Sequence, residues 1–370
     1  TDNVEQYQIL KSLQVIQVKY VALLLRLGQR ALQWKDLALA GRTHYAAAQP
    51  TTLGKRMAMF GEEMLGAFHR LGTLVESYPL RGLKGAVGTA LDQYTLLDGN
   101  LERLEKLQAQ VRHHLGFQRE LGAVGQIYPR SLDFDAISCL YQLGSGVANL
   151  ARTIRLMAGN EMLTEGFAAG QVGSSAMPHK MNTRSTERVN GLQVVLGGYV
   201  HMLGALAGDQ WFEGDVSCSV VRRVALPDSF FAIDGMIETM LHVLDDMGAY
   251  EAVIAKDLDR YLPFLTTTTL LMEAVQRGAG REQAHEAIKE HALATALEMR
   301  EKGLPENDLA ERLGSDARFP LETGEIKEIL SRSRSLTGLA GQQVESFADR
   351  VEDLAATFPA ARSIEKGRLL

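Results

Sequence analysis

The residues with the greatest capacity for chemistry lie in one loop, 173–182, which reads Gly-Ser-Ser-Ala-Met-Pro-His-Lys-Met-Asn. It holds two hydroxyl groups, Ser174 and Ser175, a cation, Lys180, and an amide, Asn182. We expect a helix directly after it. The backbone N–H groups of such a loop, together with a helix N-terminus, make a binding site for a carboxylate. A plain linker rarely combines these groups in ten residues, so the loop predicts a site for a carboxylate-bearing molecule.

Two further loops between predicted helices carry polar residues. The segment 41–55 contains His44 and, near its end, Thr51 and Thr52, either of which is suited to cap the helix that follows. The segment 81–89 is rich in glycine, which permits close approach of the backbone to an anion, but it lacks the Gly-Lys-Ser/Thr of a P-loop. A turn between two helices is its plainer interpretation.

The elements that must position these loops are helices. Apolar residues early in the chain recur at spacings of four and three, which is a heptad seam suited to packing long helices side by side. Strand-like alternation is scarce. The pattern predicts long helices at roughly 3–37, 52–78, 94–117, 133–163, 183–208 and 219–246. The predicted fold class is therefore all-α, with a long central helical bundle.

The lengths of the predicted helices change near residue 250. Predicted helices become shorter, with breaks near 278–280, 303–305 and 319–324. We therefore expect a central bundle domain over 1–250, which carries the loops with chemistry, and a smaller C-terminal helical domain over 251–370.

Composition excludes several classes of function. The 370 residues carry a net charge of −6, which argues against a nucleic-acid partner. No continuous apolar run approaches roughly 20 residues, so we expect no membrane span, and we expect no signal peptide. Two cysteines are too few for a disulfide framework or a cysteine-rich zinc site, so we expect a cytoplasmic protein. The adjacent His113 and His114 would face different sides of a helix, and we expect neither metal nor cofactor.

The loop 173–182 resembles the signature of the aspartase/fumarase superfamily, Gly-Ser-Ser-x-Met-Pro-x-Lys-x-Asn. Four further stretches, 43–56, 81–89, 125–130 and 209–213, match adenylosuccinate lyases in the same order, as does Glu-Arg after the loop. The resemblance covers nearly the whole chain. Members of that family carry a small domain before the first long helix, and we expect this chain to lack it.

The resemblance implies a β-elimination that releases fumarate from adenylosuccinate to give AMP, and from the succinyl-aminoimidazole-carboxamide ribotide to give its carboxamide. It implies that Ser174 removes the proton, with Ser175 as the main rival. His44 would protonate the leaving nitrogen, because histidine titrates near working pH. Lys180 and Asn182 would hold the carboxylates of the succinyl group.

The remaining candidates also follow from the resemblance. Glu187 matches a glutamate important for activity, although an acidic residue in a first helical turn is also favoured by the helix dipole alone. The nucleotide is expected to contact five residues, with arginine suited to phosphate: Thr43, Gln126, Arg188, Ser219 and Arg223.

Two positions depart from the family pattern. Gly214 stands where an arginine contacts substrate, so that either Arg222 or another residue replaces it, or the contacts differ. Thr183 stands where a proline commonly follows the signature.

Other functions stay open at this point. They are another superfamily activity (argininosuccinate lyase, fumarase or carboxymuconate cycloisomerase) and an inactive helical scaffold. The resemblance also implies a homotetramer in which loops of three subunits form each active site. The sequence by itself supports only apolar seams that need partners.

Overall fold

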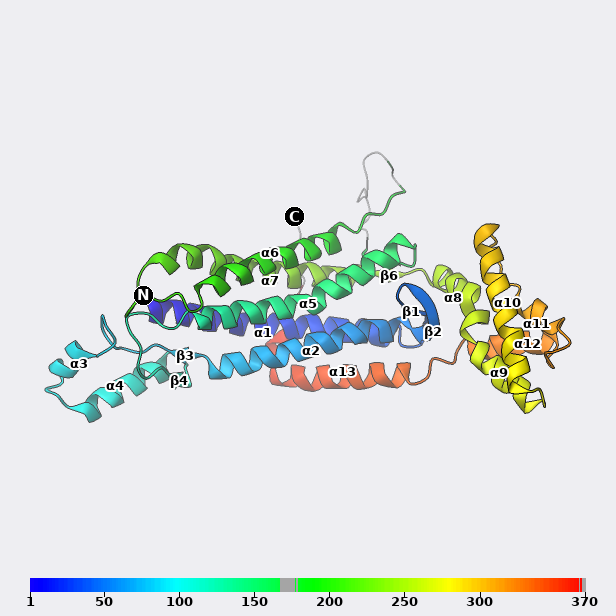
Figure 1. Ribbon diagram of the computed structural model, residues 1–370. Helices are drawn as coiled ribbons and strands as arrows, with labels where there is room; N and C mark the ends of the chain where they lie inside the picture. The colour runs from blue at the N-terminus through cyan, green and yellow to red at the C-terminus, as the bar shows by residue number, and fades with distance from the viewer. Residues whose placement is uncertain (167–176, 178, 366, 368–370) are drawn as a thin grey trace.

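The computed structural model describes residues 1–166, 177, 179–365 and 367. It shows an elongated bundle of long, roughly parallel or antiparallel helices, with a smaller helical unit at one end (Figure 1). The bundle is made of α1 (Asp2–Gln33), α2 (Leu53–Ser77), α5 (Ser131–Gly159), α6 (Arg184–Leu206), α7 (Ser217–Asp246) and α13 (Ala340–Thr357). The predicted all-α class with a long central bundle is confirmed.

The heptad seam of α1 forms the centre of the bundle core. Its apolar residues are all buried, with α2, α7 and α13 packed around them: Ile9, Leu13, Ile16, Tyr20, Leu23 and Leu27. A second apolar run, on α7, is buried in the same core: Ile233, Met236, Ile237, Met240, Leu241 and Leu244. Burial of a repeating apolar stripe is what holds helices of this length together.

The helix predicted over 94–117 is wrong as a single element. The structure has α3 (Leu91–Leu96) and α4 (Leu101–His114), separated by a turn in which Asp98 and Gly99 adopt positive φ angles of 53° and 74°. A left-handed backbone cannot continue an α-helix, so the chain breaks there. These helices lie in an arm at the far end of the bundle, next to the short strands β3 (Pro79–Leu80) and β4 (Arg119–Glu120).

The segment predicted as the first loop is in fact a β-hairpin. Strands β1 (Ala38–Thr43) and β2 (Ala46–Thr52) pair antiparallel, with a register shift between Gly41 and Arg42. Thr52 then caps α2, its hydroxyl accepting a hydrogen bond from the Lys55 N–H at 3.1 Å, as predicted. The sequence does not show the alternation of apolar and polar residues that is typical of strands, because the hairpin contains mostly alanine, glycine and threonine.

The last third of the chain divides between two cores. Helices α8 (Glu251–Leu265), α9 (Thr267–Gln276), α10 (Arg281–Glu301), α11 (Leu309–Gly314) and α12 (Thr323–Ser333) share their own hydrophobic cluster. The helix α13 instead returns to the bundle and packs against α1 and α2, where Phe347 is fully buried. A 3-10 turn, η1 (Pro359–Ser363), follows it. Thus 251–370 does not pack as a single unit.

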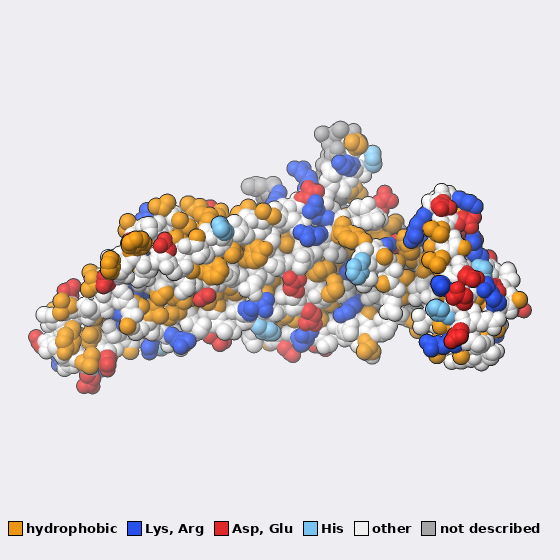
Figure 2. All heavy atoms as spheres, viewed as in Figure 1, with side chains coloured by type: hydrophobic (Ala, Val, Ile, Leu, Met, Phe, Trp, Pro, Cys, Tyr) orange, Lys and Arg blue, Asp and Glu red, His pale blue; other side chains and the backbone are white. Residues whose placement is uncertain are grey.

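The side of the bundle that includes α6 and α7 exposes large apolar side chains. Val194, Val220 and Phe231 are 76%, 73% and 73% exposed, and Figure 2 shows hydrophobic side chains gathered along the bundle. By length and composition alone, α1 and α6 would also qualify as membrane-spanning helices. The apolar window of α1 is 61% buried, that of α6 only 22%. A largely uncovered apolar helix in a bundle indicates a surface that is buried by something else.

Candidate active site

The predicted site residues that the structure describes fall into two groups at opposite ends of the bundle (Figure 1). One end holds the hairpin with Thr43 and His44, and the start of α6 with Lys180, Asn182, Glu187 and Arg188. The other end holds Gln126, Ser219 and Arg223. The two serines Ser174 and Ser175 lie outside the described residues.

His44 sits at the tip of the β1–β2 hairpin. It and Tyr45 form a two-residue turn in which both have positive φ, 52° and 65°. Such turns normally use asparagine and glycine, because a side chain at positive φ is strained, by about 1–3 kcal/mol per residue. His44 is exposed and lines the edge of a groove of ≈ 540 Å³ that continues over apolar residues of α2 and α5.

Two arginines hold this hairpin in place from different sides. From α2, Arg56 donates to the Ala40 carbonyl at 2.9 Å; burial and the nearby Arg42 lower the pKa of Arg56. From the hairpin itself, Arg42 reaches α8 and pairs with Asp257, at 2.7 and 2.9 Å to the two carboxylate oxygens. The contact of Arg42 is not predictable from the sequence, because its partner Asp257 lies 215 residues away along the chain.

The start of α6 is capped by Glu165, a residue that no motif in the sequence singles out. The side chain of Glu165, 8% exposed, accepts hydrogen bonds from the backbone N–H groups of Ser185 at 2.9 Å and Thr186 at 3.0 Å. The first N–H groups of a helix have no partner within the helix, and a carboxylate there also favours the helix dipole. The anion position at the α6 N-terminus is thus filled by the chain itself, whereas the sequence suggested it for a substrate carboxylate.

A short sheet secures the other side of the same loop. Strand β5 (Leu163–Thr164) pairs antiparallel with β6 (Gly248–Ala249) directly after α7. Gly166 has a φ of 91°, and a Cβ there would lie 2.6 Å from the Asp246 carbonyl oxygen. Both stems of the loop are therefore fixed to the bundle.

Glu187 lies on the surface one turn into α6. Its carboxylate is 3.8 Å from the Arg155 guanidinium, and its side chain is 54% exposed. Lys180 and Arg188 are exposed as well. Within the chain, then, these charged groups remain available to a ligand or to another subunit.

At the opposite end, Gln126 is held through its backbone. Its N–H donates to the Glu213 carbonyl at 2.7 Å, and Arg81 donates to the carbonyl of the preceding Gly125 at 2.6 and 3.2 Å. Lys84 forms an ion pair with Glu120 at 2.9 Å. The cations of the 81–89 loop thus bind the protein's own groups, which favours the interpretation of that loop as a structural turn. The Gln126 side chain is exposed.

Ser219 and Arg223 line one groove of ≈ 480 Å³ between α1 and α7. Arg223 is exposed and Ser219 half-buried. The grouping of a hydroxyl with a guanidinium on successive turns of one helix suits a phosphate.

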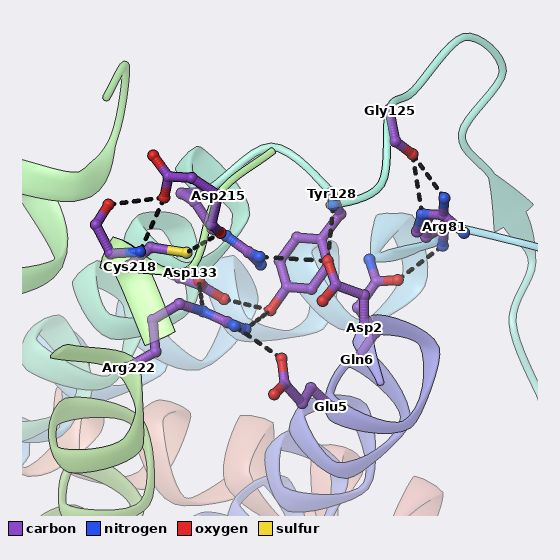
Figure 3. Close-up of polar contacts among 12 residues, drawn as sticks. Asp2, Glu5, Gln6, Arg81, Gly125, Tyr128, Asp133, Asp215, Cys218 and Arg222 are labelled. Carbon is purple, nitrogen blue, oxygen red and sulfur yellow. Dashed lines mark hydrogen bonds and ion pairs between the residues drawn. The ribbon is translucent and has the colours of Figure 1, made fainter. Parts of the chain in front are cut away.

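Arg222, the neighbour of Arg223, does not replace the missing family arginine. It is buried and donates to Asp133 at 2.5 Å, to Glu5 at 2.7 Å and to the Tyr128 hydroxyl (Figure 3). Burial alone would lower the pKa of Arg222, but Tyr128, Asp133 and Glu5 raise it well above its ordinary value. The Tyr128 hydroxyl in turn donates to Asp133 at 2.6 Å. All of these partners belong to the protein, so this arginine is a structural cation.

The backbone at Gly214 adopts a conformation that favours glycine. Its φ of 146° lies in a region that side-chain-bearing residues rarely adopt, and a Cβ there would meet Ile127 at 3.1 Å. An arginine at position 214 would be strained in this backbone conformation. The conformation is therefore consistent with glycine in place of the arginine that the family resemblance implies.

The two groups are too far apart to form one site within a chain. Ser219 and Asp246 lie near opposite ends of α7, and at 1.5 Å per residue they are about 40 Å apart. The described residues hold no group of three or more His, Cys, Asp or Glu side chains arranged to bind a metal.

Comparison with known proteins identifies relatives over most of the chain. A family model described as "Lyase" matches residues 5–198, and one described as "Adenylosuccinate lyase C-terminus" matches residues 263–347. Adenylosuccinate lyase of Saccharomyces cerevisiae is 34% identical over 350 residues, covering 95% of this chain and 72% of the relative. That of Schizosaccharomyces pombe is 32% identical over 367 residues, covering 99% and 76%.

Solved structures show the same fold at lower identity. A 3-carboxy-cis,cis-muconate lactonizing enzyme from Pseudomonas putida matches with a TM-score of 0.77 at 22% identity, over 95% of this chain and 75% of that one. A fumarate lyase from Mesorhizobium sp. BNC1 matches with a TM-score of 0.73 at 19% identity, over 94% and 75%.

Proposed function

The chain belongs to the adenylosuccinate lyase family, an enzyme family of the lyase class, and from this membership we propose that it eliminates fumarate from adenylosuccinate to give AMP. We propose the same elimination from the succinyl-aminoimidazole-carboxamide ribotide, because both substrates carry the same succinyl-amino group and phosphate. The observation that carries the proposal is the match to these lyases in sequence, with chemically suitable residues at both ends of the bundle.

The elimination needs a base, an acid and groups that stabilise negative charge. The proton beside a carboxylate is weakly acidic, so the intermediate needs electrostatic stabilisation. In the proposal Ser174 takes that proton, with Ser175 as its rival, and Lys180 and Asn182 hold the carboxylates. His44 gives a proton to the leaving nitrogen as the C–N bond breaks. Its exposed place at a hairpin tip leaves the imidazole accessible to a substrate.

The nucleotide is proposed to bind at the other group of residues. Ser219 and Arg223 take the phosphate, and Gln126 contacts the substrate beside them. Thr43 and Arg188 are assigned as further substrate contacts, and Glu187 as an orienting group for His44 or the loop. Their exposure within a single chain supports a ligand-facing role.

We further propose a homotetramer in which each active site takes residues from several subunits. The two groups lie near opposite ends of α7, which are about 40 Å apart, and this supports the proposal because no single chain can bring them to one substrate. The exposed apolar face over α6 and α7 supports it too, since burial of such a face drives association. A cytoplasmic location fits the two free, buried cysteines.

The direct test is turnover of adenylosuccinate, followed by the ultraviolet change that accompanies fumarate release. We expect activity for the protein and little for its Ser174→Ala and His44→Gln variants. Turnover of argininosuccinate, malate or a carboxymuconate in place of adenylosuccinate would overturn the substrate assignment. Full activity of Ser174→Ala would overturn the assignment of the base to Ser174.

A further inference from the structure

We propose that Arg42 is a positioning residue for His44, and that helix α8 sets where the imidazole lies through its contacts with Arg42. The inference rests on the proposed role of His44 as the acid of the elimination. It assigns a task in that reaction to the C-terminal helices α8–α12, which contribute none of the predicted site residues.

The guanidinium of Arg42 joins the tip of the hairpin to α8. One of its nitrogens donates to both oxygens of Asp257, at 2.7 and 2.9 Å. Another donates to the Tyr45 carbonyl at 3.3 Å, the residue directly after His44. The guanidinium carbon lies 5.1 Å from the centre of the Tyr261 ring, one turn further along α8. A planar cation can make these three contacts together, whereas the ammonium group of a lysine lacks the geometry.

The turn at the tip of the hairpin is strained and needs contacts from outside to hold its conformation. His44 and Tyr45 both hold a left-handed backbone, which glycine would adopt without strain. Strained residues keep their conformation only where the surroundings fix it. The bond from Arg42 to the Tyr45 carbonyl acts on the turn itself, while Arg56 holds the hairpin further back, at Ala40.

The hairpin also shares its core with the C-terminal helices. Ala40 is buried in the same hydrophobic cluster as Leu258 and Leu262 of α8, and α8 packs on both strands. Ala38 and Ala47 pack against that cluster as well. A movement of α8 therefore carries the hairpin, and with it the proposed acid.

Two substitutions on the same helix separate this role from a general effect on α8. Asp257→Asn weakens the bond between Arg42 and α8, and we call the contacts of Arg42 with Asp257 and the Tyr45 carbonyl the clamp. The matched control is Asp259→Asn, two residues away, because Asp259 forms its ion pair with Arg334, a residue outside the hairpin, at 3.2 Å. Arg42→Met removes the clamp from the hairpin side, and Arg42→Lys tests the need for a planar cation.

We expect Arg42→Met to lower kcat by about 10- to 100-fold, the range for a displaced catalytic group, with KM changed less than threefold. Asp257→Asn should give a smaller loss, Arg42→Lys an intermediate one, and Asp259→Asn none. Hydrogen exchange of the peptide covering 38–52 should rise in Arg42→Met and Asp257→Asn and stay unchanged in the control. In a His44→Gln background, Arg42→Met should cause no additional loss of kcat.

Additive losses in the His44→Gln background would overturn the proposal, because Arg42 would then act on catalysis by another route. Equal losses in Asp257→Asn and Asp259→Asn would also overturn it. If Arg42→Met does not assemble, Asp257→Asn and Arg42→Lys carry the same comparison. If the unaltered protein does not release fumarate from adenylosuccinate, the proposed function fails instead, and the exchange of 38–52 still decides whether the clamp exists.

Discussion

Glu165 accepts two hydrogen bonds from Thr186, one from its backbone N–H and one from its hydroxyl, each at 3.0 Å. The two residues stand on either side of the signature loop, so one buried carboxylate ties the chain before the loop to the first turn of α6. Lys180 and Asn182 lie just before that turn. The cap therefore links the stability of a helix end to the groups proposed to hold the substrate.

We predict that Glu165→Ala destabilises the protein by about 2 kcal/mol, because it removes a helix cap and leaves the N–H groups of Ser185 and the buried Thr186 without partners. The variant should also lose more in kcat than Glu165→Gln, which keeps one acceptor oxygen. Urea unfolding and steady-state kinetics measure the two effects. The control is Glu161→Gln at an exposed position just upstream; an equal loss in that variant would contradict the role of the cap.

The adjacent arginines 222 and 223 should behave differently. Arg222→Met leaves Asp133, which is fully buried, without its cation, and we predict a loss of about 3–5 kcal/mol in unfolding free energy. Arg223→Met should leave stability within about 0.5 kcal/mol and raise KM for the nucleotide. Chemical denaturation and KM values check both predictions. A rise in KM for Arg222→Lys at unchanged stability would instead make Arg222 a substrate contact.

Mixing subunits tests the shared active site. His44→Gln and Gln126→Ala alter residues at opposite ends of the bundle, and each should be poorly active alone. Unfolding the two variants together and refolding them should restore activity, because some sites then draw both unaltered residues from different chains. Activity no greater than the sum of the separately refolded variants would mean that each site is built by one chain, as would a monomeric mass in solution.

Burial raises the pKa of the Cys139 thiol from 9.0 to about 12. Between these values the unfolded chain loses the proton and the folded chain keeps it. Stability from this group is therefore complete below pH 9 and decreases by about 1.4 kcal/mol per pH unit above it. We predict that Cys139→Ala unfolds with a weaker pH dependence than the unaltered protein between pH 9 and 10.5, although its absolute stability is lower. Identical slopes for the two proteins would contradict the shift.

The long helices were predictable because each carries a repeating apolar stripe that one window of sequence reveals. The hairpin was not, since 38–52 is rich in alanine and threonine and shows no alternation of apolar and polar side chains. The partners of Arg222 could not be predicted from the sequence either, because Asp133 and Glu5 are 89 and 217 residues away along the chain. Family resemblance named the candidate site residues, but only the folded chain reveals that they lie in two separate groups.

The return of α13 to the bundle has a consequence for how the protein is made. This helix covers α1 and α2 and buries Phe347 against Gly61 of α2, yet the ribosome synthesises it after all the other α-helices of the described chain. Until then, apolar surface on the first two helices stays open to water. Such exposed apolar surface is prone to aggregation, and the bundle closes only when synthesis has passed residue 357.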